Sequence, residues 1–242
     1  VDLATLGSDF FNGVASDGRD IRVTTADGKT EVPIELVSLN TGLGTGELYF
    51  KADLSSVSNN DFYIYYENED AIAYADGDTY GADNVWTNGF VAVYHFDQSS
   101  PGAGNSGVYL DSTSNEYHGD DETTSATTTG QLGRGLGLGL VAGDHVELPE
   151  EVLDGETEVT VSGWYQTTKG TDQALLSAAS ASEDDEFMLT LDEGGGNINR
   201  FFVDHGPSGA EDQIFVFDSG DFNDGTWQHY MVTTDSTAVG SE

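Results

Sequence analysis

Short runs in which apolar and polar residues alternate recur along the chain and predict β-strands. In 159–165, V-T-V-S-G-W-Y, every second residue points to the same face, which is the period of a strand. Leu136–Leu140 and His145–Leu148 are shorter runs that precede it. Turn-forming pairs, Gly143-Asp144 and Asp154-Gly155, separate the three. This stretch therefore predicts three successive strands.

The first third of the chain has the same character. An alternating strand runs from Gly18 to Thr24, and Asp27-Gly28 forms a tight turn into Glu31–Val37, which predicts a hairpin. Pro33 makes the second strand an edge strand, because proline has no N–H to give to a neighbour. Two further strands are expected here, and the second is rich enough in aromatic residues to predict that it is largely buried: Glu47–Ala52 and Phe62–Tyr66.

A polar, glycine-bearing stretch near residues 80–88 divides the chain. We predict a β-rich domain over 1–83, a linker over 84–88 and a second β domain over 89–242. Helices longer than about two turns are not expected, so the fold class is all-β, with two β-sandwich domains. The strands expected in the second domain are Val91–Phe96, Leu175–Ala181, Glu186–Leu191, and Arg200–Val203 paired with Gln213–Phe217.

Four motifs in the second domain occur in a recognisable order. They are D-S-T-S-N-x-x-H-G from Asp111, G-L-x-L-x-x-G-D-H-V-E-L-P from Gly137, V-T-V-S-G-W from Val159 and G-T-W-Q-H-Y-M-V-T from Gly225. Together they resemble the LamG-like branch of the concanavalin A-like lectin/glucanase superfamily over about 89–242. The resemblance implies a jelly roll of two antiparallel sheets, often stabilised by calcium and often carbohydrate-binding. It also implies that Trp164 and Trp227 pack between the sheets.

The first domain resembles a domain of unknown function that is common in secreted prokaryotic proteins and typically precedes a LamG-like domain. The motifs that carry this resemblance are D-G-R-D-I-R-V-T-T-A-D-G, F-Y-I-Y-Y-E-N and N-V-W-T-N-G-F-V-A-V-Y-H-F. One residue departs from the pattern: Glu67 stands where that family usually has glycine, so the geometry of this turn is in question. The chain also lacks the opening strands of the first domain and several closing strands of the second. We therefore expect it to be a segment of a longer polypeptide, with an incomplete jelly roll.

The composition of the chain is unusual in its charge. Of the 242 residues, 7 are Lys or Arg and 44 are Asp or Glu, which gives a formal net charge of −37. Such self-repulsion destabilises a compact state in dilute buffer and makes nucleic acid an unexpected partner. At about 1 M salt the Debye length falls to about 3 Å, so carboxylates hardly repel one another. The hydrophobic share of 37% indicates a globular chain, and the composition therefore indicates a halophile. The alternative is an acidic surface protein of a mesophile.

Cysteine is absent, so no disulfide stabilises the fold. No apolar run of about 18 residues or more is present, so membrane insertion of this segment is not expected. An extracellular, cell-surface or virion-surface location is expected from the family resemblance.

Acidic loops beside strands are candidate calcium sites, because Ca²⁺ takes six to eight oxygen ligands at flexible geometry. The best constellation is Asp111 with Asn115, joined by Asp144 or by Asp120 or its neighbour Asp121. The alternative is that Asp111 and Asn115 form an Asx-turn without a metal. For a ligand rim, Tyr109 and Tyr117, which flank the Asp111 loop, are the candidates.

Catalytic motifs are lacking: there is no nucleophile elbow, phosphate loop or His-x-His spacing. Glu183–Glu186 lacks the spacing and alternation of a glucanase strand and is interpreted as a solvated turn. We therefore predict a non-enzymatic adhesion or glycan-recognition module of a halophile, as part of a cell-surface, filament or viral receptor-binding protein. Cell-envelope glycans or surface proteins are the expected partners, together with a possible neighbouring subunit or homo-oligomer. The alternatives are a structural spacer or assembly subunit and, third, a divergent glycoside hydrolase.

Overall fold

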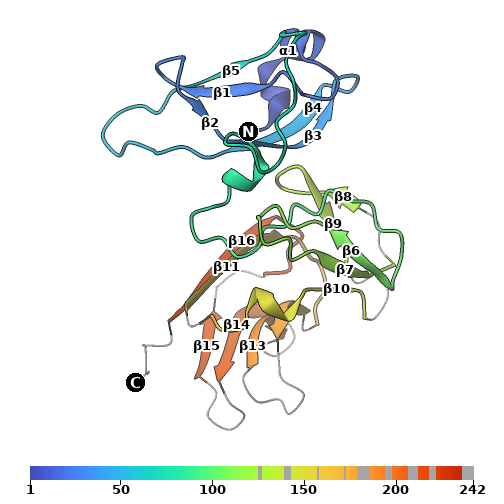
Figure 1. Ribbon diagram of the computed structural model, residues 1–242. Helices are drawn as coiled ribbons and strands as arrows, with labels where there is room; N and C mark the ends of the chain where they lie inside the picture. The colour runs from blue at the N-terminus through green and yellow to red at the C-terminus, as the bar shows by residue number, and fades with distance from the viewer. Residues whose placement is uncertain are drawn as a thin grey trace. The chain divides into compact units, whose positions relative to one another are not determined.

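The computed structural model describes residues 1–124, 127–138, 143–156, 158–171, 173–178, 186–193, 198–206, 212–217 and 222–235. Within them the fold is all-β, as predicted, and the one α-helix, α1 (Ser8–Gly13), has six residues (Figure 1). The chain divides into two compact units, Val1–Asp154 and Gly155–Glu242. The predicted junction at residues 84–88 stays a prediction.

The first unit begins with a short 3-10 helix, η1 (Leu3–Leu6), and α1, and then forms two layers of strands. One layer is a sheet of order β2-β1-β5, and the other is the β3–β4 hairpin. The strands are β1 (Arg22–Thr25), β2 (Glu31–Val32), β3 (Ile34–Asn40), β4 (Thr45–Phe50) and β5 (Phe62–Tyr65).

A single apolar core joins these two layers. Ile21 and Val23 from around β1 and Leu48 from β4 are 0% exposed, and Phe10 of α1 is 1% exposed. Partly buried side chains from β3, β4 and β5 complete the core. Alternation along the strands, predicted from the sequence, therefore places one face of each layer against the other.

The predicted hairpin forms as far as Pro33. Val23 of β1 is opposite Val32 of β2, and the turn contains Gly28 at φ 66°. Asp27 closes this turn by accepting hydrogen bonds from the N–H groups of Lys29 and Thr30, both at 2.8 Å. After Pro33 the chain leaves the sheet, and β3 pairs with β4 in the other layer. The predicted strand Glu31–Val37 is therefore two strands.

Two other expectations were wrong. β5 is not largely buried: Tyr63 and Tyr65 are 50% and 47% exposed, because an edge strand turns only alternate residues to the core. Residues 91–96 do not form a strand, and only Tyr94 makes an isolated bridge, to Asp111. The backbone there bonds to side chains of the 111–115 loop instead of to a neighbouring strand.

The remainder of the first unit is a second group of short strands. A sheet of order β10-β7-β6 contains β6 (Asn105–Tyr109), β7 (Gly119–Glu122) and β10 (His145–Glu147), while β8 (Thr127–Thr129) pairs with β9 (Arg134–Leu136). Two 3-10 helices, η2 (Ala82–Asn84) and η3 (Glu150–Val152), lie in this unit as well. The predicted strand at His145 is confirmed. Of the strand predicted at 136–140, Leu136 is the last residue of β9, residues 137 and 138 are not in a strand, and residues 139 and 140 lie outside the described residues.

The second unit contains two antiparallel sheets. In one, β11 (Glu158–Tyr165) pairs along its whole length with β16 (Gln228–Asp235). In the other, the order is β12-β13-β14-β15, and the predicted pairing of Arg200–Val203 with Gln213–Phe217 is confirmed. The strands are β12 (Gln173–Ala178), β13 (Glu186–Glu193), β14 (Ile198–Gly206) and β15 (Asp212–Phe217).

Candidate functional site

Asp111, the first predicted calcium ligand, lies in the interior and is 6% exposed. Its carboxylate accepts four hydrogen bonds from the protein. The donors are the N–H groups of Val93 (2.9 Å), Thr113 (2.9 Å) and Tyr117 (3.0 Å) and the hydroxyl of Thr113 (2.8 Å). Asp111 therefore fastens the 111–117 loop to residue 93, and the bonds to Thr113 have the form of an Asx-turn.

Three other predicted ligands, Asn115, Asp120 and Asp144, each hydrogen-bond to a different part of the chain. Each of these side chains thereby fixes a separate loop. The partners are the Val91 carbonyl for Asn115 (2.9 Å), the Gly107 N–H for Asp120 (2.7 Å), and the N–H and hydroxyl of Thr124 for Asp144 (3.0 Å each). The structure does not bring these four residues together around one point.

No group of three or more His, Asp or Glu side chains in the described part of the chain is arranged to hold a metal ion. At Asp111 a cation would compete with four protein donors for two carboxylate oxygens. Calcium binding at Asp111 and Asn115 stays a prediction, and these residues act here as loop anchors.

The two predicted ligand-rim tyrosines differ in exposure. Tyr109 is 0% exposed, and its hydroxyl donates to Asp121 at 3.1 Å while its ring packs edge-on against Phe96. Tyr117 is half-buried, and its carbonyl accepts a hydrogen bond from the hydroxyl of Tyr94. Tyr109 is therefore a core residue: it is the last residue of β6 and the only buried one in that strand.

Asp121, a candidate calcium ligand beside Asp120, is a second interior carboxylate. It is 0% exposed and accepts four hydrogen bonds. Burial raises the pKa of Asp121, but the hydrogen bonds outweigh burial and hold it below its usual value. The donors are the Ser100 hydroxyl (2.7 Å), the Gly102 N–H (3.1 Å), the Tyr109 hydroxyl (3.1 Å) and the Thr123 N–H (3.0 Å).

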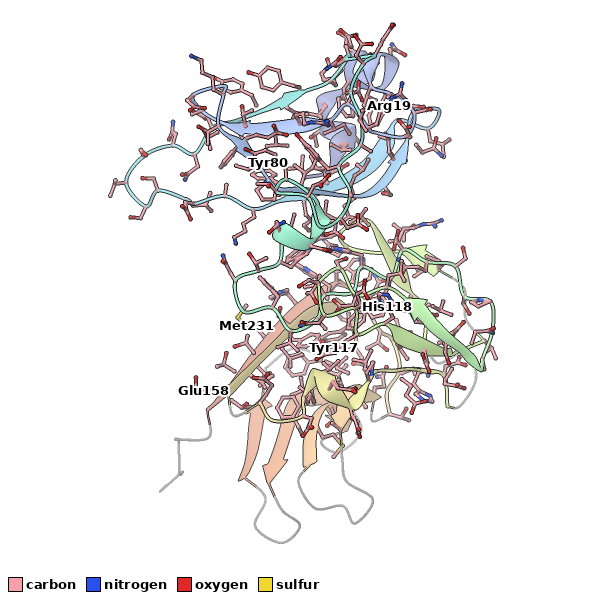
Figure 2. All side chains as sticks on the ribbon, in the orientation of Figure 1. Arg19, Tyr80, Tyr117, His118, Glu158 and Met231 are labelled. Atoms are coloured by element: carbon pink, nitrogen blue, oxygen red, sulfur yellow. The ribbon has the colours of Figure 1, made fainter. Side chains whose placement is uncertain are left out.

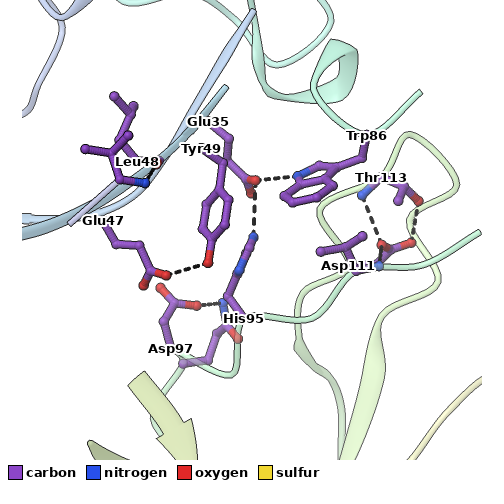
Figure 3. A network of polar contacts seen from close by, with 12 residues as sticks. Glu35, Glu47, Leu48, Tyr49, Trp86, His95, Asp97, Asp111 and Thr113 are labelled. Carbon is purple, nitrogen blue, oxygen red and sulfur yellow. Dashed lines mark hydrogen bonds and ion pairs between the residues drawn. The ribbon is translucent and has the colours of Figure 1, made fainter. Parts of the chain in front are cut away.

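A cluster of aromatic rings surrounds Glu35 of β3. Figure 3 shows the indole of Trp86 and the imidazole of His95 converging on its carboxylate, at 2.6 Å and 3.2 Å from Oε2. Tyr49 of β4 stacks on His95 with ring centroids 4.6 Å apart. Burial raises the pKa of Glu35, but hydrogen bonds from His95, Ser112 and Trp86 lower it further than burial raises it. This cluster holds residues 86–95 against the β3–β4 hairpin.

A cleft of about 460 Å³ opens in the first unit beside β1 and β3. Its two arginines are engaged with the protein: Arg19 pairs with Asp17 at 3.0 Å, and Arg22 pairs with Glu31 at 3.4 Å and lies 4.2 Å from the ring of Tyr74. Because both cations already have partners, the cleft does not present a free cation to an anionic ligand.

The face of β11 and β16 that carries Trp164 is exposed. Trp164 is 43% and Met231 65% exposed, and Figure 2 shows Met231 projecting from its strand. His229 lies opposite Trp164 and contacts its ring edge-on at 4.9 Å. The expected position of Trp164 between two sheets is therefore wrong, because it lies on the outward side of the strand alternation. Trp227 is half-buried.

Hydroxyl groups flank this aromatic pair. Thr160 and Thr233 are opposite each other with their hydroxyls 2.9 Å apart, and Ser162 is opposite Met231. From residue 160 to 164 and from 229 to 233 no Asp, Glu, Lys or Arg occurs, although the chain carries a net charge of −37. We call Thr160, Ser162, Trp164, His229, Met231 and Thr233 the outer face of β11–β16. It combines an exposed indole with uncharged hydrogen-bonding groups.

The fold is all-β, and its described strands pair antiparallel. Residues 140–241 match the family model of the concanavalin A-like lectin/glucanases superfamily, and residues 17–109 match a domain of unknown function, DUF2341. Both resemblances predicted from the sequence are confirmed. Comparisons with curated proteins and with solved structures found no match.

Concanavalin A-like domains of the laminin G type bind carbohydrates or proteins, are typically non-catalytic and are often extracellular. None of the described helices is long and apolar enough to cross a membrane. Of the Glu183–Glu186 run, predicted to be a solvated turn, residues 183–185 lie outside the described residues and Glu186 begins β13.

Proposed function

We propose that this chain is a non-catalytic recognition module of an extracellular, surface-displayed protein of a halophile, and that it mediates adhesion by binding glycans. The observation that carries the proposal is the outer face of β11–β16, where Trp164 is 43% exposed. Large aromatic side chains are normally buried, and exposed ones gather at recognition sites.

The chemistry of this face suits a neutral sugar. The C–H groups of a pyranose ring pack on an indole, and its hydroxyls exchange hydrogen bonds with Ser and Thr side chains. His229 supports the indole edge and adds a further ring nitrogen beside it. No carboxylate occurs between residues 160 and 164 or between residues 229 and 233. This face therefore does not add to the repulsion that the acidic chain exerts on negatively charged glycans.

The test is binding of the protein to cell envelopes and purified envelope glycans of halophilic cells at multimolar salt. Trp164→Ala is expected to weaken glycan binding at least about tenfold, which corresponds to about 1.4 kcal/mol. Phe90→Ala is the matched control, because Phe90 is a similarly exposed aromatic residue (49%) in the other unit. Equal binding by the wild type and Trp164→Ala, with both folded by circular dichroism, would exclude this face as the site.

A calcium chelator belongs in the same experiment. If the predicted calcium site at Asp111 and Asn115 supports recognition, chelation abolishes saturable binding by the wild type. If binding survives chelation but not Trp164→Ala, recognition depends on the outer face without calcium. The test for the glycoside hydrolase alternative is release of reducing sugar from the same glycans, which the proposal expects not to occur.

A further inference from the structure

β5 is an open edge in the first unit. The sheet has the order β2-β1-β5, so β5 pairs with β1 on one side: Arg22 is opposite Tyr65 and Thr25 is opposite Phe62. On its other side no described strand pairs with it. An edge strand presents unpaired N–H and C=O groups, which can accept a further strand.

Apart from its short length of four residues, this edge lacks the devices by which proteins usually protect one. Its residues, Phe62 to Tyr65, include no charged residue and no proline, and its pairing with β1 has no bulge. Phe62 and Ile64 pack against the core, while Tyr63 and Tyr65 are 50% and 47% exposed. The edge of the strand is therefore protected by its shortness alone, and its outer face is aromatic.

We propose that a second copy of this chain pairs with β5 antiparallel, edge to edge, about a two-fold axis at Ile64. In this register Tyr63 is opposite Tyr65 of the partner subunit, so both aromatic residues of each copy form cross-strand pairs. A register centred on a residue keeps Phe62 and Ile64 on the core side in both copies, as the period of two along a strand requires. The two three-stranded sheets become one continuous sheet of six strands.

Charge favours a second copy over an unrelated acidic partner strand. With a net charge of −37, two copies repel wherever acidic surfaces meet, but the paired segments here are uncharged. Carboxylates meet only at the two ends of the pairing, where Asp61 comes opposite Glu67 of the partner subunit. Screening of these end charges requires molar salt, so the association strengthens as salt rises.

The first experiment measures the mass of the whole chain by light scattering and sedimentation over a salt series. A dimer that forms progressively with salt is expected. Tyr63→Lys places a charge on the edge and is expected to weaken dimerisation at least tenfold. Leu43→Lys is the matched control, because Leu43 is 77% exposed at the β3–β4 turn and changes the net charge equally. A monomer at every salt concentration, or a dimer weakened equally by both variants, overturns the proposal.

Cross-linking tests the register without depending on how Tyr63→Lys folds. The chain contains no cysteine, so introduced thiols are unambiguous. In the variant carrying both Tyr63→Cys and Tyr65→Cys, oxidation at molar salt is expected to give a covalent dimer. Leu43→Cys is expected to remain monomeric under the same conditions. Cross-linking of Leu43→Cys without cross-linking of the double variant would place the interface elsewhere and overturn the proposal.

Discussion

The backbone N–H of Glu67 donates a 2.8 Å hydrogen bond to Oδ2 of Asp20, 47 residues earlier in the chain. Asp20 is 3% exposed, and its Oδ1 also accepts from the N–H of Ala15 at 3.0 Å. This carboxylate therefore fixes the end of β5 against the segment that leads from α1 to β1. The contact holds Glu67 at φ 68°, in the left-handed region that side chains other than glycine rarely adopt.

Replacing Glu67 with glycine should stabilise the first unit. The left-handed conformation costs a residue with a Cβ about 1–2 kcal/mol, whereas glycine adopts it freely. Part of this gain is offset by the greater freedom of glycine in the unfolded chain, so we expect about 0.5–1 kcal/mol. Thermal unfolding at molar salt measures the change. Glu69→Gly, two residues along the same loop, is the control and should give no gain.

Gly13 and Glu67 should be energetically coupled. A Cβ built on Gly13 would lie 2.2 Å from Oε1 and 2.6 Å from Cγ of Glu67, so Gly13→Ala requires the Glu67 side chain to move. We expect Gly13→Ala to cost about 1–3 kcal/mol in the wild type. In the Glu67→Gly background the obstructing atoms are gone, and the cost should largely disappear. Additive free energies of unfolding in this double-mutant cycle would show that the two residues do not interact.

The family resemblance identified the turn at Glu67 as unusual, but only the structure gives its cause. Alternation and turn residues were sufficient for the strands with long partners, such as Val159–Tyr165, and for the Asp27-Gly28 turn. These two signals failed for residues 91–96, where the backbone hydrogen-bonds to side chains and not to a neighbouring strand. The backbone of residues 91–93 bonds to the side chains of Asp111, Thr113 and Asn115. Such long-range partners leave no periodic signal in the sequence.

For the site residues, residue type alone did not separate a ligand-binding carboxylate from a structural one. Asp111 and Asp121 were both candidate calcium ligands, yet each is buried and accepts four hydrogen bonds from the protein. Nor did sequence position decide exposure of the aromatic residues. Tyr109 and Trp164 both lie in strands, and which face of each strand is covered depends on the layers packed against it.

The hydrogen bond from Trp86 to Glu35 should contribute measurably to the stability of the first unit. Trp86→Phe retains a ring near Tyr49 and Phe90, which lie 5.3 Å and 5.1 Å from the indole, but it removes the N–H donor. Loss of a hydrogen bond to a buried carboxylate costs about 1.5–3 kcal/mol. Denaturant unfolding of Trp86→Phe measures this cost. Trp164→Phe, at an exposed position, should change stability by less than about 0.5 kcal/mol.

Acid should destabilise the first unit through Asp121 and Glu35, whose folded pKa values both lie below the ordinary values of 3.8 and 4.5. A carboxyl group with a lowered folded pKa stabilises the folded state fully at a pH above its unfolded pKa. That contribution is lost as the pH falls through the folded pKa. The free energy of unfolding should therefore begin to decline at a pH just above these ordinary pKa values and continue to decline as the pH falls further.

The acid series must be run at molar salt, because protonation also relieves the repulsion among 44 acidic residues and by itself favours the folded state. Asp121→Asn should be less stable near neutral pH and should show a shallower decline with acid, since its position no longer titrates. Asp53→Asn removes one exposed charge and is the control, with the slope of the wild type. If Asp121→Asn and the wild type decline with the same slope, Asp121 does not link folding to pH.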